Sequence, residues 1–323
     1  MTTSHPVAVL DDYQQVAEDL VDWSRAGIEV TSFPHHLSDE DELVEALAGF
    51  EIVVAMRERT PFPAELLRRL PDLRLLVTTG PSNAAIDVAT AVQAGIVVCG
   101  TDSLVSPTVE LTWGLIIALN RNIVTEDVAM RDGRWQHTLG EGLEGRTLGL
   151  LGLGRIGTRV AAVGQAFGME TIAWSQNLTK ERAASVGVTA VDKPSLFADA
   201  DVVSVHLRLS ERSRGLVGAD ELAGLGPKGL LVNTSRAAIV DQEALLRALE
   251  AGMLGGAGLD VYDQEPLPAD DRLRSAPRTV LTPHLGYVTR QNYEVFFRGA
   301  LEDIEAYLAG EPIRVIAPPG PAA

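Results

Sequence analysis

The sequence Gly152-Leu153-Gly154-Arg155-Ile156-Gly157 joins the apolar run 147–151 to a segment of helical spacing that continues to about Phe167. A G-x-G-x-x-G pattern between a strand and a helix is typical of domains that bind a dinucleotide. An ordinary glycine-rich turn is the alternative interpretation. The strand before the motif, the helix after it and the strand that follows all favour the dinucleotide site.

Each position of this motif has a physical reason. Gly152 is expected to form a tight turn, and Gly154 to let the backbone approach a pyrophosphate. Gly157 is expected to let the helix pack closely on the preceding strand. The first turn of the helix, which includes Arg155 and Ile156, presents backbone N–H groups and a positive dipole end to the phosphates.

Short apolar runs alternate with helix-like segments on both sides of the motif. This alternation predicts parallel sheets covered by helices. We therefore expect an α/β protein with two doubly wound parallel-sheet domains, a Rossmann-type cofactor domain and a flavodoxin-like substrate domain, separated near residues 100–107. The expected strands are 7–10, 52–55, 73–77 and 96–98 in the first domain, and 147–153, 171–174, 201–207, 229–234, 257–261 and 279–282 in the second.

Three helices are predicted from spacing and end signals. One covers 38–48 with Ser38 as its N-cap, and another covers 289–308 after the last strand. Pro107 is expected at the first position of a long helix that continues to about Met130.

Composition excludes several classes of protein. The formal charge of −17 argues against nucleic-acid binding, which needs clustered Lys and Arg. The longest apolar stretch, 111–119, is far shorter than the roughly 20 residues of a membrane helix, and the N-terminus lacks a signal-peptide pattern. The single cysteine, Cys99, lies in an apolar run and is expected to be a buried thiol. We expect a cytoplasmic protein, and we predict no metal site.

The second strand of the cofactor domain bears on the choice between NAD and NADP. An Asp or Glu is expected roughly 20 residues after the glycines in NAD-binding domains, where it binds the ribose hydroxyls. Ser175 lies 18 positions after Gly157, and no acid is present at 175–177. Ser175 and Asn177 can donate to a ribose or a 2′-phosphate, and Arg208 can add positive charge. The preference between NAD and NADP stays open.

Chemically competent side chains follow three strands of the second domain. Arg236, Glu265 and His284 are expected to meet because the carboxyl ends of parallel strands face the ligand crevice. Reduction of a ketone needs a proton donor, a cation near the carbonyl oxygen and an anchor for the carboxylate. His284 suits the first role, and Glu265 would orient its ring. Arg236 suits the other two, while Asp260 could bind the nicotinamide carboxamide or position Arg236.

The chain resembles the D-isomer-specific 2-hydroxyacid dehydrogenase family, which includes glyoxylate/hydroxypyruvate reductases and 3-phosphoglycerate dehydrogenases. Three ordered signatures carry the resemblance: the glycine motif, Asn233-Thr234-Ser235-Arg236 and Pro283-His284-Leu285-Gly286. The resemblance implies that Arg236, Glu265 and His284 are the catalytic trio and that Asp260 lies beside the nicotinamide. It implies further cofactor contacts from His206, Thr234 and Gly286.

The resemblance also implies a discontinuous organisation and a homodimer. Residues 1–102, completed by 289–323, would form the substrate domain, and 103–288 the cofactor domain. Two departures from the family pattern stand out. Ala237 replaces the usual glycine after the arginine, and Arg208 replaces a proline, which places a cation near the expected adenosine end. Glu265 itself argues against formate dehydrogenases, which carry glutamine there.

Two segments of the first domain are candidates for substrate binding. The loop Thr79-Gly80-Pro81-Ser82-Asn83 follows a strand and resembles the family loop whose backbone N–H groups hold the substrate carboxylate, with added donors from Ser82 or Asn83. Arg57 follows another strand and could reach a second anionic group. Trp135 and Tyr287 could line the pocket or belong to the core.

The sequence thus predicts an oxidoreductase that interconverts a small 2-oxo acid and its D-2-hydroxy acid, of the glyoxylate/hydroxypyruvate reductase type. A 3-phosphoglycerate dehydrogenase is the alternative within the enzyme class, and the end of the chain at Ala323 leaves no room for an appended regulatory domain. A non-enzymatic NAD(H)-sensing protein, similar to the C-terminal-binding-protein corepressors, is the alternative outside it. The absence of long disordered arms and of a basic face weakens that reading.

Overall fold

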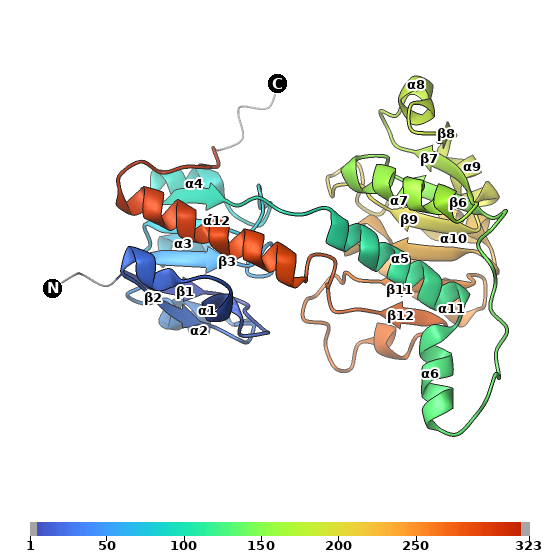
Figure 1. Cartoon of the computed structure of the whole chain (residues 1–323), viewed down its shortest axis with the longest axis horizontal. Coiled ribbons are helices and arrows are strands. Elements are labelled where there is room, and N and C mark those ends of the chain that lie inside the picture. Colours follow the sequence, from blue (N-terminus) through green and yellow to red (C-terminus); the bar gives the residue numbers. More distant parts are fainter. Residues whose placement is uncertain (1–4, 318–323) are drawn as a thin grey trace. The chain divides into compact units, whose positions relative to one another are not determined.

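The computed structural model describes residues 5–317, so the two chain ends included in the predicted domains lie outside the described residues. The chain divides into two compact units (Figure 1). The first combines the residues up to Leu104 with those from Thr289 onward, and the second is Val105–Val288.

The first unit contains a five-stranded parallel sheet of order β2-β1-β3-β4-β5. This order is that of flavodoxin-like folds, as predicted. Strand β2 was not predicted, because only its first residue, Ile28, is buried and the strand has no continuous apolar run. The strands are β1 (His5–Val9), β2 (Ile28–Ser32), β3 (Ile52–Ala55), β4 (Leu75–Thr78) and β5 (Val97–Gly100).

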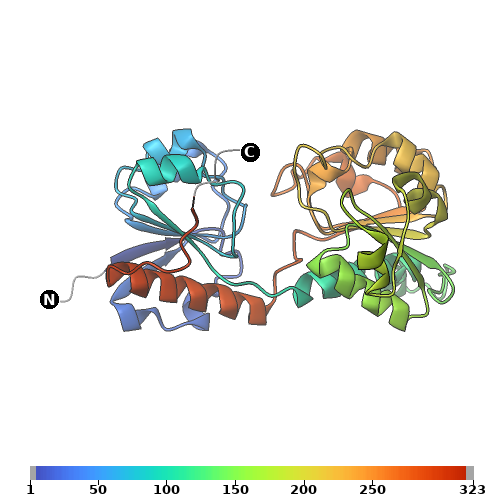
Figure 2. The same cartoon turned by 90° about the horizontal axis from the view of Figure 1, so that it is seen from above.

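Helices cover both faces of this sheet (Figure 2). One face carries α2 (Glu40–Ala46), α3 (Ala64–Arg68) and α4 (Val88–Gln93), and the other carries α1 (Ala17–Leu20), η1 (Trp23–Ala26) and α12 (Arg290–Leu308). The prediction that Ser38 caps α2 was wrong. Asp39 is the cap, and its carboxylate accepts hydrogen bonds from the amides of Asp41 and Glu42.

The second unit contains a seven-stranded parallel sheet of order β12-β11-β10-β9-β6-β7-β8. From β6 the strands follow one another in chain order toward one edge of the sheet, and from β9 they follow one another toward the other edge. The strand order therefore reverses between β6 and β9, as in Rossmann folds. Together the two sheets confirm the predicted fold class. The strands are β6 (Thr147–Leu151), β7 (Glu170–Trp174), β8 (Thr189–Ala190), β9 (Val202–Val205), β10 (Leu230–Asn233), β11 (Gly256–Leu259) and β12 (Thr279–Leu281).

Two layers of helices cover the second sheet and bury its apolar faces. One layer contains α5 (Ser106–Asn120), α7 (Arg155–Ala166) and α8 (Lys180–Ala184), and the other α9 (Lys193–Asp199), α10 (Ala219–Leu225) and α11 (Gln242–Glu250). A short 3-10 turn, η2 (Ala237–Ile239), follows β10, and a second one, η3 (Arg272–Ser275), precedes β12.

The single long helix predicted up to Met130 is in fact two helices. It breaks after α5 at Asn122, whose φ of +52° is left-handed, a conformation that asparagine tolerates. Helix α6 (Ile123–Arg131) then extends away from the sheet (Figure 1). Pro107 occupies the second position of α5, not the first. Apolar spacing continues through the break because α6 carries apolar side chains on an exposed face.

Cys99 is a fully buried free thiol, as predicted, and burial raises its pKa to about 12. Among residues 5–317, every helix is too short or too polar to span a bilayer. The same residues contain no cluster of three side chains suited to a metal ion.

Candidate active site

The glycine motif forms the turn between β6 and α7. Gly152 has a φ of +110°, and a Cβ at this position would lie 2.8 Å from the carbonyl of His206. A Cβ on Gly157 would lie only 2.2 Å from the carbonyl oxygen of Gly152, whereas one on Gly154 would meet nothing within 4 Å. The first and last glycines are thus required by the fold, and the middle one faces open space.

The first turn of α7 points its amides out of the helix. The first intrahelical bond runs from the amide of Thr158 to the carbonyl oxygen of Gly154 (3.0 Å), so the amides of residues 154–157 precede it. Gly154 and Arg155 are exposed, and Gly154 serves as N-cap without a side chain. Amides that precede the first intrahelical bond, at the positive end of a 12-residue helix, fit a pyrophosphate, and the open space above Gly154 fits its close approach.

The segment after β9 contributes His206 and Arg208. The His206 Nε2 atom lies 2.9 Å from Ser204 Oγ, and burial lowers the pKa of this histidine to about 4. His206 is therefore neutral at physiological pH. Arg208 is exposed, and its carbonyl oxygen accepts a hydrogen bond from Ser213 Oγ (2.7 Å), which fixes the turn that presents its side chain.

The end of β7 provides the two predicted ribose-side donors. Ser175 directly follows the strand and is half-buried, and its carbonyl oxygen accepts from the amide of Leu178 (3.0 Å) to form a turn. Asn177 lies in that turn and is exposed. Both residues follow the carboxyl end of the second strand, and their contact with the ribose stays a prediction.

His284 and Glu265 form the central pair of the second unit. His284 Nδ1 lies 2.5 Å from Glu265 Oε2, with 17% and 24% of the two side chains exposed. The other carboxylate oxygen of Glu265 accepts from the amide of Tyr262 (2.9 Å). Because Nδ1 faces the carboxylate, Nε2 on the opposite side of the ring is the nitrogen that can exchange a proton with a ligand. The ring of Tyr287 contacts the imidazole edge-on at 5.3 Å.

Asp260 holds the backbone on which His284 sits. Its Oδ1 accepts from the amide of Leu285 (2.7 Å) and from Thr282 Oγ1 (2.6 Å), and its Oδ2 accepts from the amide of Gly286 (2.8 Å). The side chain is fully buried, and this burial raises its pKa. Asp260 therefore positions the loop of His284, a role that the sequence analysis did not foresee. Its predicted contact with the nicotinamide stays a prediction.

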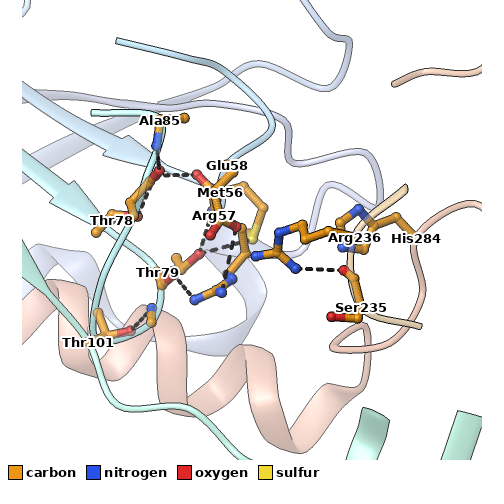
Figure 3. A network of polar contacts seen from close by, with 12 residues as sticks. Met56, Arg57, Glu58, Thr78, Thr79, Ala85, Thr101, Ser235, Arg236 and His284 are labelled. Atoms are coloured by element: carbon orange, nitrogen blue, oxygen red, sulfur yellow. Dashed lines mark hydrogen bonds and ion pairs between the residues drawn. The ribbon is translucent and has the colours of Figure 1, made fainter. Parts of the chain in front are cut away.

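Arg236 follows β10 and lies in a loop whose backbone is held by hydrogen bonds from Asn233. Asn233 Nδ2 donates to the carbonyl oxygen of Arg236 (3.0 Å), and its Oδ1 accepts from the amide of Ser235 (3.0 Å). The Arg236 guanidinium donates to the carbonyl oxygen of Ser235 (2.8 Å; Figure 3). The role of Asn233 was not predicted from the sequence, although Asn side chains commonly form such turns.

Two predicted cofactor residues mainly join helix α5 to the strand ends. Thr234 Oγ1 lies 2.8 Å from Thr112 Oγ1, and the carbonyl oxygen of Gly286 accepts from Thr108 Oγ1 (2.8 Å). Both threonines belong to α5. These bonds tie the loops of Arg236 and His284 to a common helix.

Substrate-side candidates occupy the carboxyl ends of β3 and β4 in the first unit. Arg57 has a left-handed φ of +55°, and its backbone is held by Thr79 Oγ1 (2.9 Å) and Asn83 Nδ2 (2.6 Å). Its guanidinium donates to the carbonyl oxygen of Thr79 (3.1 Å; Figure 3). A Cβ on Gly80 would lie 1.8 Å from this guanidinium, so Gly80 is needed for Arg57 to lie across the loop.

The loop differs from the prediction in one respect. The amide of Gly80 donates to Thr101 Oγ1 (2.7 Å) and that of Thr79 donates to Ala55 (3.0 Å), so both already have acceptors. Asn83 is buried and fully used in holding Arg57, Thr78 and Ala85. Ser82 is exposed at the tip of the loop. A carboxylate bound here would rely on the amides and hydroxyl beyond Pro81.

The two aromatic residues that were candidates for lining the pocket, Tyr287 and Trp135, differ in burial. Tyr287 is buried against His284, as expected of a residue that lines a site or a core. Trp135 lies in the loop after α6 with 72% of its surface exposed, so the core role considered for it is wrong, and its pocket role stays a prediction.

The structure thus groups the candidates by unit. In the second unit, Arg236, Glu265 and His284 follow the adjacent strands β10, β11 and β12. In the first, Arg57 and the loop 79–83 follow β3 and β4. Each set lies at the carboxyl edge of its own sheet, the edge at which α/β proteins bind ligands.

Comparisons with known proteins agree with this geometry. Residues 113–286 match the family model described as "D-isomer specific 2-hydroxyacid dehydrogenase, NAD binding domain". The chain is 37% identical over 257 residues to a glyoxylate reductase of Aeropyrum pernix, covering 76% of this chain and 77% of the relative. It is 32% identical to a D-3-phosphoglycerate dehydrogenase of Synechocystis, covering 85% of this chain but only 50% of that protein.

A solved structure extends the similarity over nearly the whole chain. A crystal structure of a phosphoglycerate oxidoreductase from Vibrio cholerae is 39% identical, superposes with a TM-score of 0.90, and covers 95% of this chain and 99% of that one. The predicted family, cofactor class and enzyme class are thereby confirmed. The chain belongs to the D-isomer specific 2-hydroxyacid dehydrogenase family and is a nicotinamide-dependent oxidoreductase.

Proposed function

We propose that this chain reduces small 2-oxo acids of the glyoxylate and hydroxypyruvate type to D-2-hydroxy acids. The observation that carries the proposal is the 2.5 Å contact between His284 and Glu265, beside the strand that presents Arg236. A proton donor and a cation at neighbouring strand ends are what carbonyl reduction requires. The glyoxylate reductases among the relatives, such as that of Aeropyrum pernix, support the substrate class.

His284 acts as the general acid in this proposal. A bound reduced nicotinamide supplies the hydride. Glu265 holds Nδ1, so Nε2 delivers its proton to the carbonyl oxygen as negative charge develops there. Glu265 stabilises the imidazolium that this step requires and fixes the plane of the ring. In the reverse direction the same nitrogen removes the hydroxyl proton.

Arg236 supplies the positive charge. Its planar guanidinium can bind the substrate carboxylate through two parallel hydrogen bonds and polarise the adjacent carbonyl. The bonds of Asn233 hold the backbone of the loop from which this side chain extends. In the first unit we propose that Arg57 and Ser82 contribute substrate contacts, supported by their place at the carboxyl edge of that sheet.

We propose that both NADH and NADPH are accepted. The turn after β7 carries Ser175, Gln176 and Asn177, so no carboxylate is there to repel a 2′-phosphate. Arg208, after β9, adds an exposed cation at a neighbouring part of the same sheet edge.

The test is a panel of assays that follow the oxidation of NADH and NADPH by glyoxylate, hydroxypyruvate and pyruvate. A second set follows the reduction of NAD⁺ and NADP⁺ by 3-phosphoglycerate. His284→Ala should lower kcat by about 10²–10⁴-fold while the dinucleotide still binds. The exposed His35→Ala serves as the matched control and should retain full turnover. Unchanged turnover in His284→Ala would refute the assigned role. Dinucleotide binding without any oxidation would favour a non-enzymatic sensor.

We also propose that the chain forms a homodimer through α6 and the loop after it. Six large apolar side chains are exposed in this segment: Ile123, Val124, Val128, Met130, Trp135 and Leu139. Its charges pair locally, Asp127 with Arg131 (2.9 Å) and Glu126 with His137 (3.2 Å), so the apolar face is not opposed by unpaired charge. A patch of this kind is typical of a protein interface.

Light scattering after gel filtration tests the dimer. Val128→Asp should convert the wild-type dimer to a monomer, because it places a charge in the apolar face. Val92→Asp in α4 is the control, since Val92 is 49% exposed against 52% for Val128. A wild-type protein that elutes as a monomer would refute this part of the proposal.

A further inference from the structure

The hydroxyl of Tyr262 belongs to the second unit and has no part in the chemistry described so far. Tyr262 is 8% exposed, and its hydroxyl lies within hydrogen-bond reach of two carbonyl oxygens, those of Leu259 (3.1 Å) and Thr282 (3.0 Å). Burial raises the pKa of Tyr262, and the carboxylates of Asp260 and Glu265 raise it further. The hydroxyl therefore stays protonated and donates to these carbonyls, one at the end of β11 and the other directly after β12.

The carbonyl oxygen of Thr282 begins the turn that carries His284. It accepts from the amide of His284 (2.9 Å) and thereby closes a three-residue turn around Pro283. The amide of Thr282 donates to the carbonyl oxygen of Leu259 (2.9 Å), so the two carbonyls that the Tyr262 hydroxyl contacts are joined through the same residue. The phenol oxygen of Tyr262 thus holds the point at which the chain leaves β12 for His284.

The backbone of Tyr262 holds the carboxylate that pairs with His284. The amide of Tyr262 donates to Glu265 Oε1 (2.9 Å), while Glu265 Oε2 lies 2.5 Å from His284 Nδ1. Tyr262 therefore binds both members of the pair, the carboxylate through its amide and the histidine turn through its hydroxyl. Because the Tyr262 side chain is buried and rigid, this one residue relates the position of Glu265 to that of His284.

Asp260 acts on the other side of the same turn. Its carboxylate accepts from the amides of the two residues that follow His284 in the chain. The Tyr262 hydroxyl instead donates to a carbonyl that precedes His284. The turn is thus held on both sides of the histidine, and the residue that holds its first part, Tyr262, also binds Glu265.

We propose that Tyr262 is a positioning residue for proton transfer, because it holds the Glu265 carboxylate and the His284 turn at a fixed separation. This inference rests on the proposed function, in which His284 donates a proton to the substrate carbonyl. Loss of the hydroxyl would free the turn to move away from Glu265 and would weaken the contact that stabilises the imidazolium. Both carbonyls keep a second donor, the amide of Thr282 or that of His284, so the fold should survive this loss.

The test is Tyr262→Phe, which removes one oxygen atom and keeps both the ring and the hydrogen bond from the amide to Glu265. We expect kcat for glyoxylate reduction to fall about three- to tenfold, the effect of one lost hydrogen bond, with KM and the dinucleotide Kd unchanged. As the pH rises, kcat should also begin to fall at a lower pH than in wild type, because the imidazolium is the proton donor and is less stabilised. The titratable groups that face His284 in the described contacts, Glu265, Asp260 and Tyr287, are the same in both proteins.

Two comparisons separate positioning from a merely structural effect. Tyr307→Phe is the matched control, because it removes the same atom from a half-buried tyrosine in the last turn of α12 and should leave kcat and its pH profile unchanged. In a Glu265→Gln background, Tyr262→Phe should lower kcat by a smaller factor than in wild type, because the carboxylate–imidazolium contact through which it acts is already lost.

The result that would overturn this inference differs from the one that would overturn the proposed function. Urea unfolding of Tyr262→Phe first checks that the compared proteins are folded. Equal factors in the two backgrounds, or a Tyr262→Phe variant whose kcat and pH profile match wild type, overturn this inference alone. Unchanged turnover in His284→Ala, or a wild type that reduces no 2-oxo acid, overturns the proposed function and this inference with it.

Discussion

Gly154→Ala tests the cofactor site without disturbing the fold. A Cβ at Gly154 would meet nothing within 4 Å, and its φ of −87° is one that alanine adopts without strain. The free energy of unfolding should therefore stay the same or rise by a few tenths of a kcal/mol, up to about 1 kcal/mol. The added methyl group nevertheless occupies the space through which a pyrophosphate would approach the amides of α7. We expect the dinucleotide Kd to rise about tenfold or more, equivalent to the loss of one charge-assisted hydrogen bond.

Gly157→Ala should weaken the same binding for a different reason. Its Cβ would lie 2.2 Å from the Gly152 carbonyl oxygen, whereas ordinary contact begins at 3.4 Å, so helix and turn must separate by about 1.2 Å. Overpacking of this kind costs about 1–3 kcal/mol of stability. A displacement of that size also stretches a 2.9 Å hydrogen bond beyond the usual limit for N–H···O. Both stability and dinucleotide affinity should fall.

Fluorescence titration with NADH and NADPH, paired with urea unfolding of each apo variant, distinguishes the two effects. Gly114→Ala, in an exposed and equally open position of α5, controls for the substitution itself and should leave both Kd values unchanged. The reasoning is refuted if Gly154→Ala binds both dinucleotides as tightly as wild type. It is also refuted if Gly154→Ala unfolds as readily as Gly157→Ala, because the position would then be required by the fold.

Three further predictions concern other parts of the chain. Ser175→Asp should raise the Kd for NADPH about tenfold relative to that for NADH, because a carboxylate at the end of β7 repels a 2′-phosphate. An unchanged ratio of the two Kd values would show that this turn does not contact the 2′ position of the ribose. Asp260→Asn should destabilise the chain by about 1–3 kcal/mol and lower kcat, because its amide cannot accept the three hydrogen bonds that hold the loop of His284; wild-type stability and kcat would contradict this role. Burial raises the pKa of the Asp303 carboxyl from 3.8 to about 6, so the folded state binds a proton at Asp303 more tightly than the unfolded chain does. This tighter binding adds to the free energy of unfolding at low pH, and the added stability is lost as the pH rises through 6. Relative to Asp303→Asn, the wild type should gain about 1 kcal/mol of unfolding free energy between pH 7 and pH 5, and urea titrations at the two pH values that show no such gain would contradict the shift.

The elements that the sequence predicted are those whose burial is continuous. Strands such as β3 and β6 are buried at nearly every position, and β3 reads as an unbroken apolar run. The missed strands, β2 and β8, lie at sheet edges and are largely half-exposed or exposed. The break at Asn122 was missed because the exposed apolar face of α6 continues the spacing of α5, and spacing alone does not distinguish a face that packs on a core from one that faces outward.

The site residues were predictable where they follow a strand and carry unusual chemistry, as Arg236 and His284 do. The residues that hold them were not. Asp260 reads as one more acid at a strand end until the strand order places β11 beside β12, where its carboxylate meets the amides of Leu285 and Gly286. Thr101 takes the amide of Gly80 only because β4 and β5 pair in register, with Thr78 opposite Gly100. Such contacts depend on which strands become neighbours, and that order is set by the packing of the whole sheet.

The two carboxylates that follow β11, Asp260 and Glu265, hold different parts of the His284 segment. The backbone of His284 is left-handed, with a φ of +52°, a conformation that persists only where the surroundings enforce it. Asp260, fully buried, enforces it by binding the two amides that come next, while Glu265, partly exposed, binds the ring. A buried carboxylate has no access to a substrate proton, whereas the His284 ring is bound by Glu265 at Nδ1 and has its second nitrogen, Nε2, on the opposite side of the ring. The acids that follow β11 therefore hold both the backbone of His284 and its Nδ1 atom, which leaves Nε2 as the nitrogen that we propose to exchange a proton with the substrate.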